Sequence, residues 1–450
     1  MAVYDLLQLD ITLTANGIPQ AVRAQIEEYL YNHNFFNGGS DPLHDAPHAE
    51  VTNTQTPNSD VEWLGGAHIT VTTDANLNYI LDAQAGNDIT INGGANDIGV
   101  SILGNTHLTL NDAGDDSISA NGGGNTIDAS GSSGDVTVRG SSSGSDTIFG
   151  GSGHDVLIAA QGGGEVRSGS TNAPGSWNVL IDENATGATA LIGGGGADTI
   201  YAQGNDTLHL GTGDNQAAWA LGGSNTLIGG SGADQTLRAS GSGVAGPGFD
   251  IILGGTGNNF LWADGTAGSG KMFSRSDAGG NAHVLDNEST NSWTMVAGEG
   301  NDTIYSGDGS DVLATGFGAV NQQLVAGGGD DLLISRTTGG ITTLYAGTGN
   351  DTLDASTSSG INVFYIGYGN ETVKGGSGFD YFNDTSVTGS AGSSSNVINV
   401  TGQSGDILHF TDRTAAEKTG DNISGGIRTI DFSDGQQYKV SAVVTVEFHS

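Results

Sequence analysis

Four acidic residues recur every 20 residues in the C-terminal half of the chain, and each follows two glycines that lie two and four residues before it. The acidic residues are Asp311, Asp331, Asp351 and Glu371, and the glycines are Gly307, Gly309, Gly327, Gly329, Gly347, Gly349, Gly367 and Gly369. Carboxylates and glycine carbonyls are oxygen ligands, and no Cys or His keeps a fixed offset from them. Oxygen ligands alone favour a hard cation, so these residues are predicted to bind several Ca2+ ions.

The chain around these residues alternates pieces of nine and eleven residues, such as GTGNDTLDA and STSSGINVFYI at positions 347–366. Short runs of alternating apolar and small residues predict strands, and the glycine-rich runs between them predict turns. In a solenoid of such coils, residues one coil apart stack at about 4.8 Å. The carboxylates would then form one column, which repels itself unless a cation lies between the coils.

The nonapeptides that match this pattern best are GGSGADQTL (229–237), GEGNDTIYS (298–306), GDGSDVLAT (307–315) and GTGNDTLDA (347–355). On these motifs the chain resembles the RTX (repeats-in-toxin) family of calcium-binding β-roll proteins. The resemblance covers roughly residues 84–384 and is most specific over 298–384. It implies an all-β fold, a right-handed parallel β-roll or β-helix solenoid with coils of about 20 residues.

Other acidic residues keep the repeat less regularly. Asp97, Asp116, Asp135 and Asp155 lie 19, 19 and 20 residues apart. At Asn215 and Asn259 an amide replaces the carboxylate, and an amide is a weaker calcium ligand, so about half of the turns are expected to be structural only. The remaining predicted metal ligands are Asp116, Asp146, Asp155, Asp198, Asp206, Asp234, Asp302 and Asp380.

Two segments of the repeat region resemble each other. Residues 176–202 echo residues 282–306, and Asp182 and Asp198 correspond to Asp286 and Asp302, each 104 residues later. The similarity predicts a duplicated block, with chance similarity in glycine-rich sequence as the alternative.

The composition limits the classes of partner. The 450 residues include 50 Asp and Glu, 12 Lys and Arg and no Cys, which gives a formal net charge of −38. Nucleic acid and anionic membrane surfaces are therefore poor partners, and disulfides and thiolate metal sites are excluded. We expect no membrane span, since no run of 18 apolar residues occurs, and MAVYDLLQLD has no signal-peptide pattern.

The segments on either side of the repeats predict three parts: an N-terminal segment 1–60, a solenoid 61–384 and a C-terminal β cap 385–450. Residues 18–34 read as a short amphipathic helix that either caps the first coil or contacts another subunit. His44, Asp45 and His48 have the spacing of a zinc site, but Pro47 interrupts it, so chance placement in a loop is preferred. Alternating residues after 385 predict antiparallel hairpins, and VVTVEF is consistent with a C-terminal secretion signal.

The resemblance implies export by a type I system, which needs no N-terminal signal peptide, and folding in calcium outside the cell. We expect a secreted or cell-surface structural protein that binds Ca2+ and assembles with itself, as a homo-oligomer, lattice or filament, into a surface layer, sheath or biofilm matrix. Cell-surface polysaccharide is a further expected partner. One alternative is an adhesin or carbohydrate-binding module, although regular Thr-x-Thr ranks for ice binding are missing. The other is a polysaccharide-active β-helix enzyme, which the scattered basic residues disfavour, so no enzymatic activity is expected.

Overall fold

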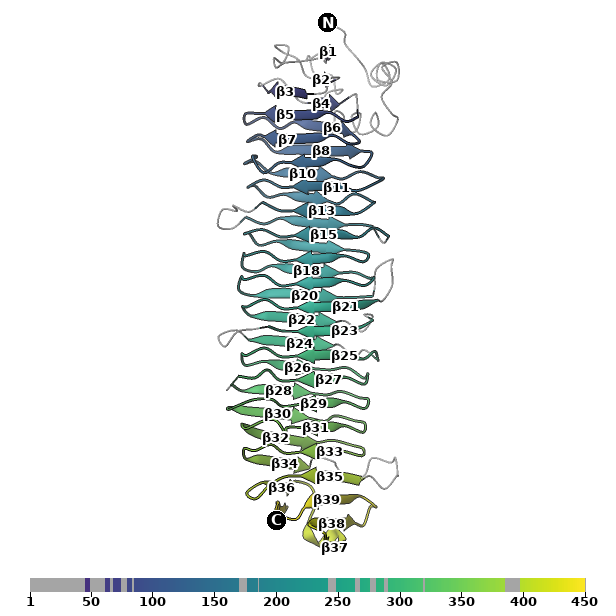
Figure 1. Cartoon of the computed structure of the whole chain (residues 1–450), viewed down its shortest axis with the longest axis vertical. Helices are drawn as coiled ribbons and strands as arrows, with labels where there is room; N and C mark the ends of the chain where they lie inside the picture. The colour runs from purple at the N-terminus through teal and green to yellow at the C-terminus, as the bar shows by residue number, and fades with distance from the viewer. Residues whose placement is uncertain are drawn as a thin grey trace. The chain divides into compact units, whose positions relative to one another are not determined.

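The computed structural model describes residues 45–48, 61–64, 68–73, 79–82, 85–169, 176–184, 186–241, 248–263, 268–275, 281–286, 290–318, 320–384 and 397–449. The expected helix at 18–34 and His44 lie outside the described residues. The chain divides into two compact units, Met1–Ala220 and Leu221–Ser450. Each unit is a parallel β-solenoid in which successive strands alternate between two sheets (Figure 1).

Unit 1 has a first sheet that consists of β1 (Asp45–His48), β2 (Val61–Leu64), β4 (Tyr79–Asp82), β6 (Gly99–Leu103), β8 (Asp116–Asn121), β10 (Val136–Arg139), β12 (Val156–Ile158), β14 (Val179–Asp182), β16 (Thr199–Ala202) and β18 (Ala217–Ala220). The second sheet consists of β3 (His68–Thr72), β5 (Asp88–Asn92), β7 (His107–Asn111), β9 (Thr126–Asp128), β11 (Asp146–Phe149), β13 (Gly164–Arg167), β15 (Thr189–Ile192) and β17 (Thr207–His209). Strand β1 lies in segment 1–60, the segment expected to precede the solenoid, and it pairs in parallel with β2.

Unit 2 has a first sheet that consists of β20 (Gln235–Ala239), β22 (Asn259–Ala263), β24 (Ala282–Asp286), β26 (Thr303–Tyr305), β28 (Gln322–Val325), β30 (Ile341–Tyr345), β32 (Ile361–Ile366), β34 (Asp380–Asp384), β36 (Ile407–Phe410) and β40 (Thr445–Phe448). The second sheet consists of β19 (Thr226–Ile228), β21 (Phe249–Leu253), β23 (Ser269–Phe273), β25 (Trp293–Val296), β27 (Val312–Ala314), β29 (Leu332–Ile334), β31 (Thr352–Asp354), β33 (Thr372–Lys374), β35 (Val397–Thr401), β37 (Lys418–Ser424), β38 (Ile427–Phe432) and β39 (Gln437–Ser441).

Each short strand points one or two apolar side chains into the coil, which is why alternating sequence suffices to build the core. In the second sheet of unit 2, the register stacks Leu313 on Leu333 and Leu333 on Leu353, and all three are fully buried. In the first sheet, the rings of Phe364 and Phe382 stack with their centroids 4.9 Å apart. The 20-residue repeat thus becomes a set of side-chain columns that run from coil to coil.

The C-terminal segment differs from the expected set of antiparallel hairpins. The parallel ladders continue past residue 384, because β35 pairs with β33, β36 with β34, β39 with β35 and β40 with β36. Within the described residues of this segment, β38 pairs antiparallel with β37 and β39. Alternating sequence suits either orientation, and here the free edges of β33 and β34 provide parallel partners.

Helix is nearly absent from the described part of the chain, where a single 3-10 turn, Ala415–Glu417, is found. No helix in that part is long and apolar enough to cross a membrane.

Candidate metal-binding turns

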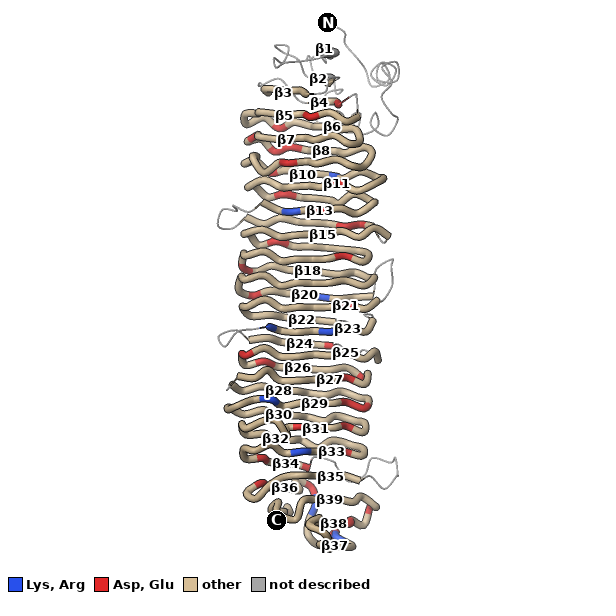
Figure 2. Tube along the Cα trace, viewed as in Figure 1, with Lys and Arg blue, Asp and Glu red and all other residues tan. Residues whose placement is uncertain are grey.

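The regular acidic residues form one column in unit 2. Asp311, Asp331, Asp351 and Glu371 come directly before β27, β29, β31 and β33, whose residues pair in register. Acidic segments accordingly recur beside β27, β29 and β31 in Figure 2. All four side chains are at most 2% exposed. The spacing of 20 residues in the sequence therefore does place these carboxylates one above another.

One oxygen of each aspartate in this column ties two coils together. The Asp311 Oδ1 atom accepts a hydrogen bond from the backbone N–H of Trp293 at 2.6 Å. The backbone N–H of Asp311 donates to Asp331 Oδ1 at 2.7 Å, and that of Asp331 donates to Asp351 Oδ1 at 2.8 Å. Each carboxylate thus accepts from the preceding coil and positions its own strand.

The second oxygen of each aspartate has no partner. The Oδ2 atoms of Asp311, Asp331 and Asp351 are buried without a hydrogen bond, as are both carboxylate oxygens of Glu371. An unsatisfied buried oxygen costs about 1–3 kcal/mol, and more when it is charged. Several such atoms in one column require a compensating positive charge or a proton.

Because a buried negative charge is costly, burial raises the pKa values of the acidic residues in the column. It raises the pKa of Asp311 to about 6 and the pKa values of Asp331 and Asp351 to about 7. For Glu371, burial and then repulsion from Asp351 raise the pKa to about 9. At neutral pH each of these carboxyl groups must therefore either keep a proton or carry a buried negative charge that no cation compensates.

The glycines of these turns leave space for carbonyl oxygens. A Cβ atom at Gly329 would lie 2.2 Å from the carbonyl oxygen of Gly309, and one at Gly349 would lie 1.6 Å from that of Gly329. Gly349 also has φ +145°, which L side chains rarely adopt. Only glycine fits here, and its absence of a side chain lets the carbonyls of one turn approach the next.

These residues fit a hard cation such as Ca2+. The orphaned buried carboxylate oxygens and the turn carbonyls are all oxygen donors, the set that calcium prefers. Among the residues that the structure describes, no three His, Asp or Glu side chains are placed to hold a metal by themselves. Backbone carbonyls would therefore have to complete the coordination of any ion in these turns.

Three other buried aspartates each accept an N–H group of their own turn with the Oδ2 atom. Gly194 N–H donates to Asp198 Oδ2 at 2.6 Å in unit 1, and Gly298 N–H donates to Asp302 Oδ2 at 2.7 Å in unit 2. Asp380 Oδ2 accepts from the N–H of its own turn in the same way, at 2.6 Å. The two segments with similar sequences thus form the same local structure, which supports a duplication.

Unit 1 contains both kinds of turn. The Oδ2 atoms of Asp116 and Asp155 are buried without a partner, and burial raises the pKa of Asp116 to about 7 and that of Asp155 to about 6. Both oxygens of Asp146 accept backbone N–H groups, from Asn125 at 2.9 Å and Ser141 at 2.7 Å. Asp116 and Asp155 therefore resemble the orphaned column, whereas Asp146 does not.

Asp234 is not brought into any column. It lies exposed with φ +54°, and the next residue, Gln235, takes the buried position that pairs with Asn259. The same shift occurs at Asn215, which has φ +57° and precedes the buried Gln216. One extra residue in these turns moves the acidic or amide side chain out to solvent.

Two buried aspartates that the glycine motif does not mark join the acidic turns. Asp286 ends β24, neither of its oxygens has a partner, and burial followed by repulsion from Asp311 raises its pKa to about 8. The second is Asp182, which ends β14 in unit 1. Burial and then repulsion from Asp182 raise the pKa of Asp206, a predicted ligand, to about 7. The sequence signal that could identify these two residues is the duplication, in which Asp286 follows Asp182 by 104 residues.

Comparison with known protein families finds one match. The model described as the RTX calcium-binding nonapeptide repeat, in four copies, matches the repeat region and includes the turns of Asp311, Asp351 and Glu371. The matched residues are 128–157, 141–164, 185–217, 218–241, 244–267, 294–319, 336–358 and 365–384. Neither the curated proteins nor the solved structures give a significant match.

Proposed function

The chain belongs to the RTX repeat family, with calcium-binding nonapeptide repeats across residues 128–384, and on this premise we propose that it is a secreted structural protein whose acidic turns bind Ca2+. The observation that carries the proposal is the column of buried carboxylates, each with an oxygen that has no protein partner. Calcium would supply positive charge between the coils and remove the cost of those oxygens.

Different residues of the turns would supply different oxygen ligands to the calcium ion. Asp331 and Asp351 would each offer the Oδ2 atom that no N–H group uses, while their Oδ1 atoms keep the coils in register. Gly309 and Gly329 would offer carbonyl oxygens from the same turns. Asp286 would add a carboxylate beside Asp311, since repulsion between these two side chains contributes to the raised pKa of Asp286.

Calcium-dependent folding suits export, because RTX repeat proteins are typically secreted. With little calcium, a formal charge of −38 favours an extended chain. In millimolar calcium, binding to the folded turns stabilises the solenoid by mass action. The protein would therefore fold outside the cell.

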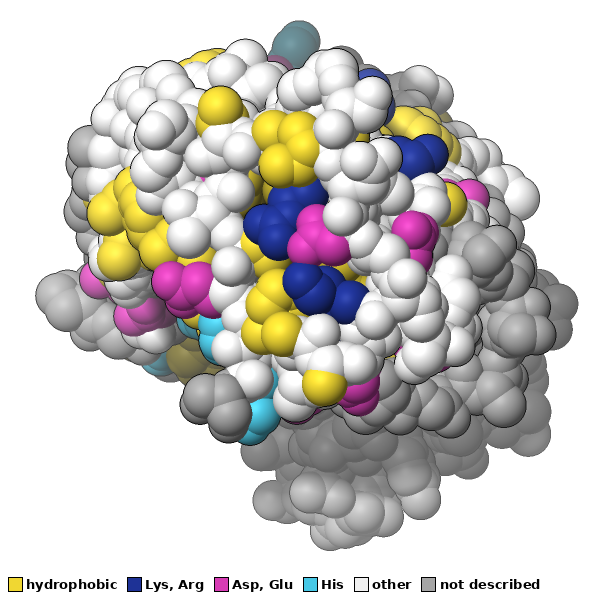
Figure 3. Space-filling model, turned by 90° about the horizontal axis from the view of Figure 1, so that it is seen from below, with side chains coloured by type: hydrophobic (Ala, Val, Ile, Leu, Met, Phe, Trp, Pro, Cys, Tyr) yellow, Lys and Arg dark blue, Asp and Glu magenta, His cyan; other side chains and the backbone are white. Residues whose placement is uncertain are grey.

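Assembly of several copies into a layer, sheath or matrix is the further part of the proposal. Four of the 12 Lys and Arg residues lie between Arg413 and Lys439, at an end where Figure 3 shows basic side chains beside acidic and hydrophobic ones. Ile423 and Ile427 in this segment are exposed, as is Val443 just after it. Such an end supports contact with the acidic surface of another copy, because charges of opposite sign attract and apolar side chains gain from burial.

Carbohydrate adhesion is the second candidate, and an aromatic row on the outer face of unit 2 favours it. The rings of Tyr345 and Tyr365 stack at 4.4 Å on neighbouring coils, and Tyr305 lies in the same row at 41% exposure. Flat rows of tyrosine provide apolar faces for sugar rings together with hydroxyl groups for hydrogen bonds.

Light scattering of the purified chain tests the assembly proposal. We expect large species in millimolar calcium and none in chelator, and replacement of Ile423 by Glu should reduce their amount. A chain that stays monomeric at high concentration in calcium would favour adhesion instead. Adhesion is then tested by comparing how strongly the parent chain and the Tyr345→Ala variant are retained on a polysaccharide column.

A further inference from the structure

A glutamine side chain closes one of the repeat turns of unit 2. Gln322 lies one coil after Asp302, because the residues that follow them pair between β26 and β28. Its Nε2 group donates to the carbonyl oxygens of Gly298 and Gly300, at 2.9 and 3.1 Å. Its Oε1 atom accepts the N–H of Gly316 at 2.9 Å. The side chain thus bridges its own turn and the turn of the preceding coil.

In unit 1 the amide nitrogen of Gln216 makes the corresponding contacts, although its Oε1 atom has no partner. Gln216 lies one coil after Asp198, and its Nε2 group is 2.9 Å from the carbonyl oxygen of Gly196 and 3.3 Å from that of Gly194. The Nε2 group also donates to Asp198 Oδ2 at 3.2 Å. Two glycine carbonyls and one carboxylate, the oxygen donors of a Gly-x-Gly-x-Asp turn, therefore surround a single nitrogen.

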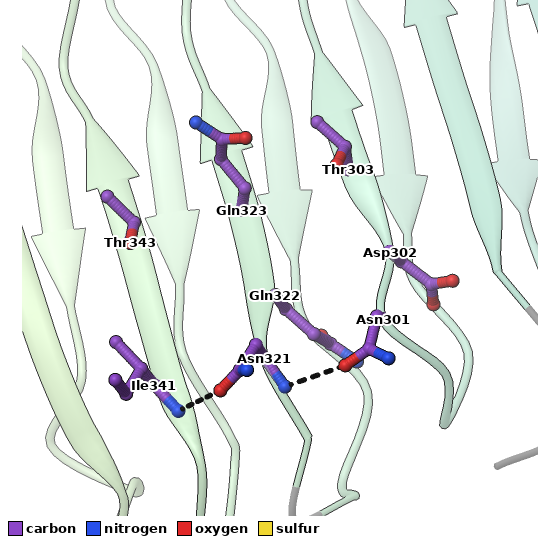
Figure 4. A pocket seen from close by; sticks show the side chains of 8 residues that line it. All are labelled: Asn301, Asp302, Thr303, Asn321, Gln322, Gln323, Ile341 and Thr343. Carbon is purple, nitrogen blue, oxygen red and sulfur yellow. Dashed lines mark hydrogen bonds between the residues drawn. The ribbon is translucent and has the colours of Figure 1, made fainter.

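Figure 4 shows the side chains around this closure in unit 2. Gln322 reaches toward the preceding coil, where Asn301 and Asp302 lie, whereas Gln323 points elsewhere. Gln322 is 3% exposed, so its hydrogen bonds are shielded from water. Its oxygen does what Asp302 Oδ2 does for its own turn, which is to accept a glycine N–H.

We infer that Gln216 and Gln322 take the place of calcium in these two turns, which therefore do not bind it. The inference rests on the proposed calcium-binding function of the other turns. The amide nitrogen directs its partial positive charge at the same oxygens that a cation would contact, and it is held by the chain itself. Asp198 and Asp302, which the glycine motif marks as ligands, are then structural residues.

The sequence carries a mark of such turns. Gln216 follows Asn215, Gln235 follows Asp234 and Gln322 follows Asn321. Asn215 and Asp234 take the left-handed conformation, which lengthens the turn and brings the glutamine inward. Gln235 Oε1 accepts the N–H of Gly230 at 3.0 Å, as Gln322 Oε1 does in its own turn. The Nε2 atom of Gln235 has no partner, whereas those of Gln216 and Gln322 contact glycine carbonyls. An Asn-Gln or Asp-Gln pair after the glycines thus marks an inward glutamine, and the inference is confined to Gln216 and Gln322.

Two isosteric, charge-matched variants test the inference. Gln322→Glu replaces the amide nitrogen by an oxygen that faces the carbonyls of Gly298 and Gly300, so this turn should need a cation. Gln323→Glu adds the same charge at the neighbouring residue, which takes no part in the closure. The number of Ca2+ ions bound per full-length chain is measured by equilibrium dialysis at pH 8, with circular dichroism as the check that each variant folds.

We expect Gln322→Glu to bind one ion more than the parent chain and Gln323→Glu to bind the same number as the parent. At a calcium concentration just sufficient to fold the parent chain, Gln322→Glu should unfold at a lower temperature than Gln323→Glu. Equal ion counts and equal unfolding temperatures for the two variants would overturn the inference. If the parent binds no calcium, the proposed function fails, and one ion bound by Gln322→Glu alone would still support the inference.

Discussion

At the residue scale, one carboxylate oxygen distinguishes the candidate calcium ligands from other aspartates in the same glycine motif. In a candidate ligand, the Oδ2 atom has no hydrogen-bond partner. Asp331 and Asp302 are both buried and both follow the Gly-x-Gly pattern. Asp302 accepts from Gly298 N–H with its Oδ2 atom, whereas Asp331 Oδ2 has no partner. The glycine motif therefore predicts a turn, and the surrounding N–H groups decide whether that turn needs a cation.

Replacing Asp331 with Asn is expected to reduce calcium binding. The amide oxygen can still accept the N–H of Asp311, but the second atom becomes an N–H donor that repels a cation. Isothermal titration should count at least one ion fewer than in the parent chain. Asp330→Asn removes the same charge from an exposed position in this turn and should leave the count unchanged. Equal counts in both variants would contradict the assignment.

The raised pKa values in the column predict that the stability of the calcium-free chain falls as the pH rises, whereas calcium affinity increases. Folding raises the pKa of Asp331 to about 7 and that of Glu371 to about 9, above the unfolded values of about 4. These groups therefore hold protons more tightly in the calcium-free folded chain than in the unfolded chain. Their contribution to stability is greatest below about pH 4 and is lost as the pH rises through 7 to 9.

In chelator, the β signal measured by circular dichroism should accordingly be stronger at pH 5 than at pH 8. Calcium must displace these protons, so its affinity should fall from pH 8 to pH 5, and titrations in buffers of different ionisation enthalpy should show proton release. Glu371→Gln should flatten the dependence above pH 7. A β signal in chelator that does not change between pH 5 and pH 8 would refute the role of these carboxylates.

At the element scale, the strands are short and depend on the columns of side chains that they stack. β29 has three residues, and only its middle residue, Leu333, points into the coil. Its neighbours one coil away are Leu313 and Leu353. A strand this short contributes few ladder hydrogen bonds, so its position depends on this apolar contact and on the turn before it.

Leu333→Ala should therefore destabilise the chain by about 2–5 kcal/mol, the usual cost of a buried Leu-to-Ala change. Leu332→Ala, on the half-buried outward side of the same strand, should cost about 1 kcal/mol or less. Denaturant unfolding in saturating calcium measures both. Similar losses for the two variants would show that the inward column does not dominate the packing.

Much of this element structure could be predicted from the sequence. The 20-residue spacing of Asp311, Asp331 and Asp351 fixes one coil length, and a parallel solenoid converts that spacing into a stack. The acidic column and the glycine turns follow from the repeat alone. Local regularity is sufficient here because each coil contacts mainly its neighbours.

The remaining features depend on details that the repeat does not encode. Asp234 leaves its expected site because one extra residue shifts Gln235 inward. Asp286 lies at a strand end, outside the glycine motif, and becomes a candidate ligand only because the next coil brings Asp311 near it. The C-terminal strands pair parallel because the edges of β33 and β34 are available, which alternation cannot predict.

At the scale of the whole molecule, charge opposes folding unless it is neutralised. The formal net charge is −38, and within the described residues several carboxylates are buried. Burying charge without compensation is costly, and the column in unit 2 contains no Lys or Arg at the corresponding positions. Calcium binding and folding should therefore be one coupled event, with the glutamine-closed turns ordered once the neighbouring acidic turns are filled.

A calcium titration of the parent chain in chelator-treated buffer at pH 8, followed by far-ultraviolet circular dichroism, tests the central claim most directly. We predict a weak β signal without calcium and a cooperative rise to the full β signal in the millimolar range. A full β signal in chelator, with an unfolding midpoint that does not move when calcium is added, would contradict the account.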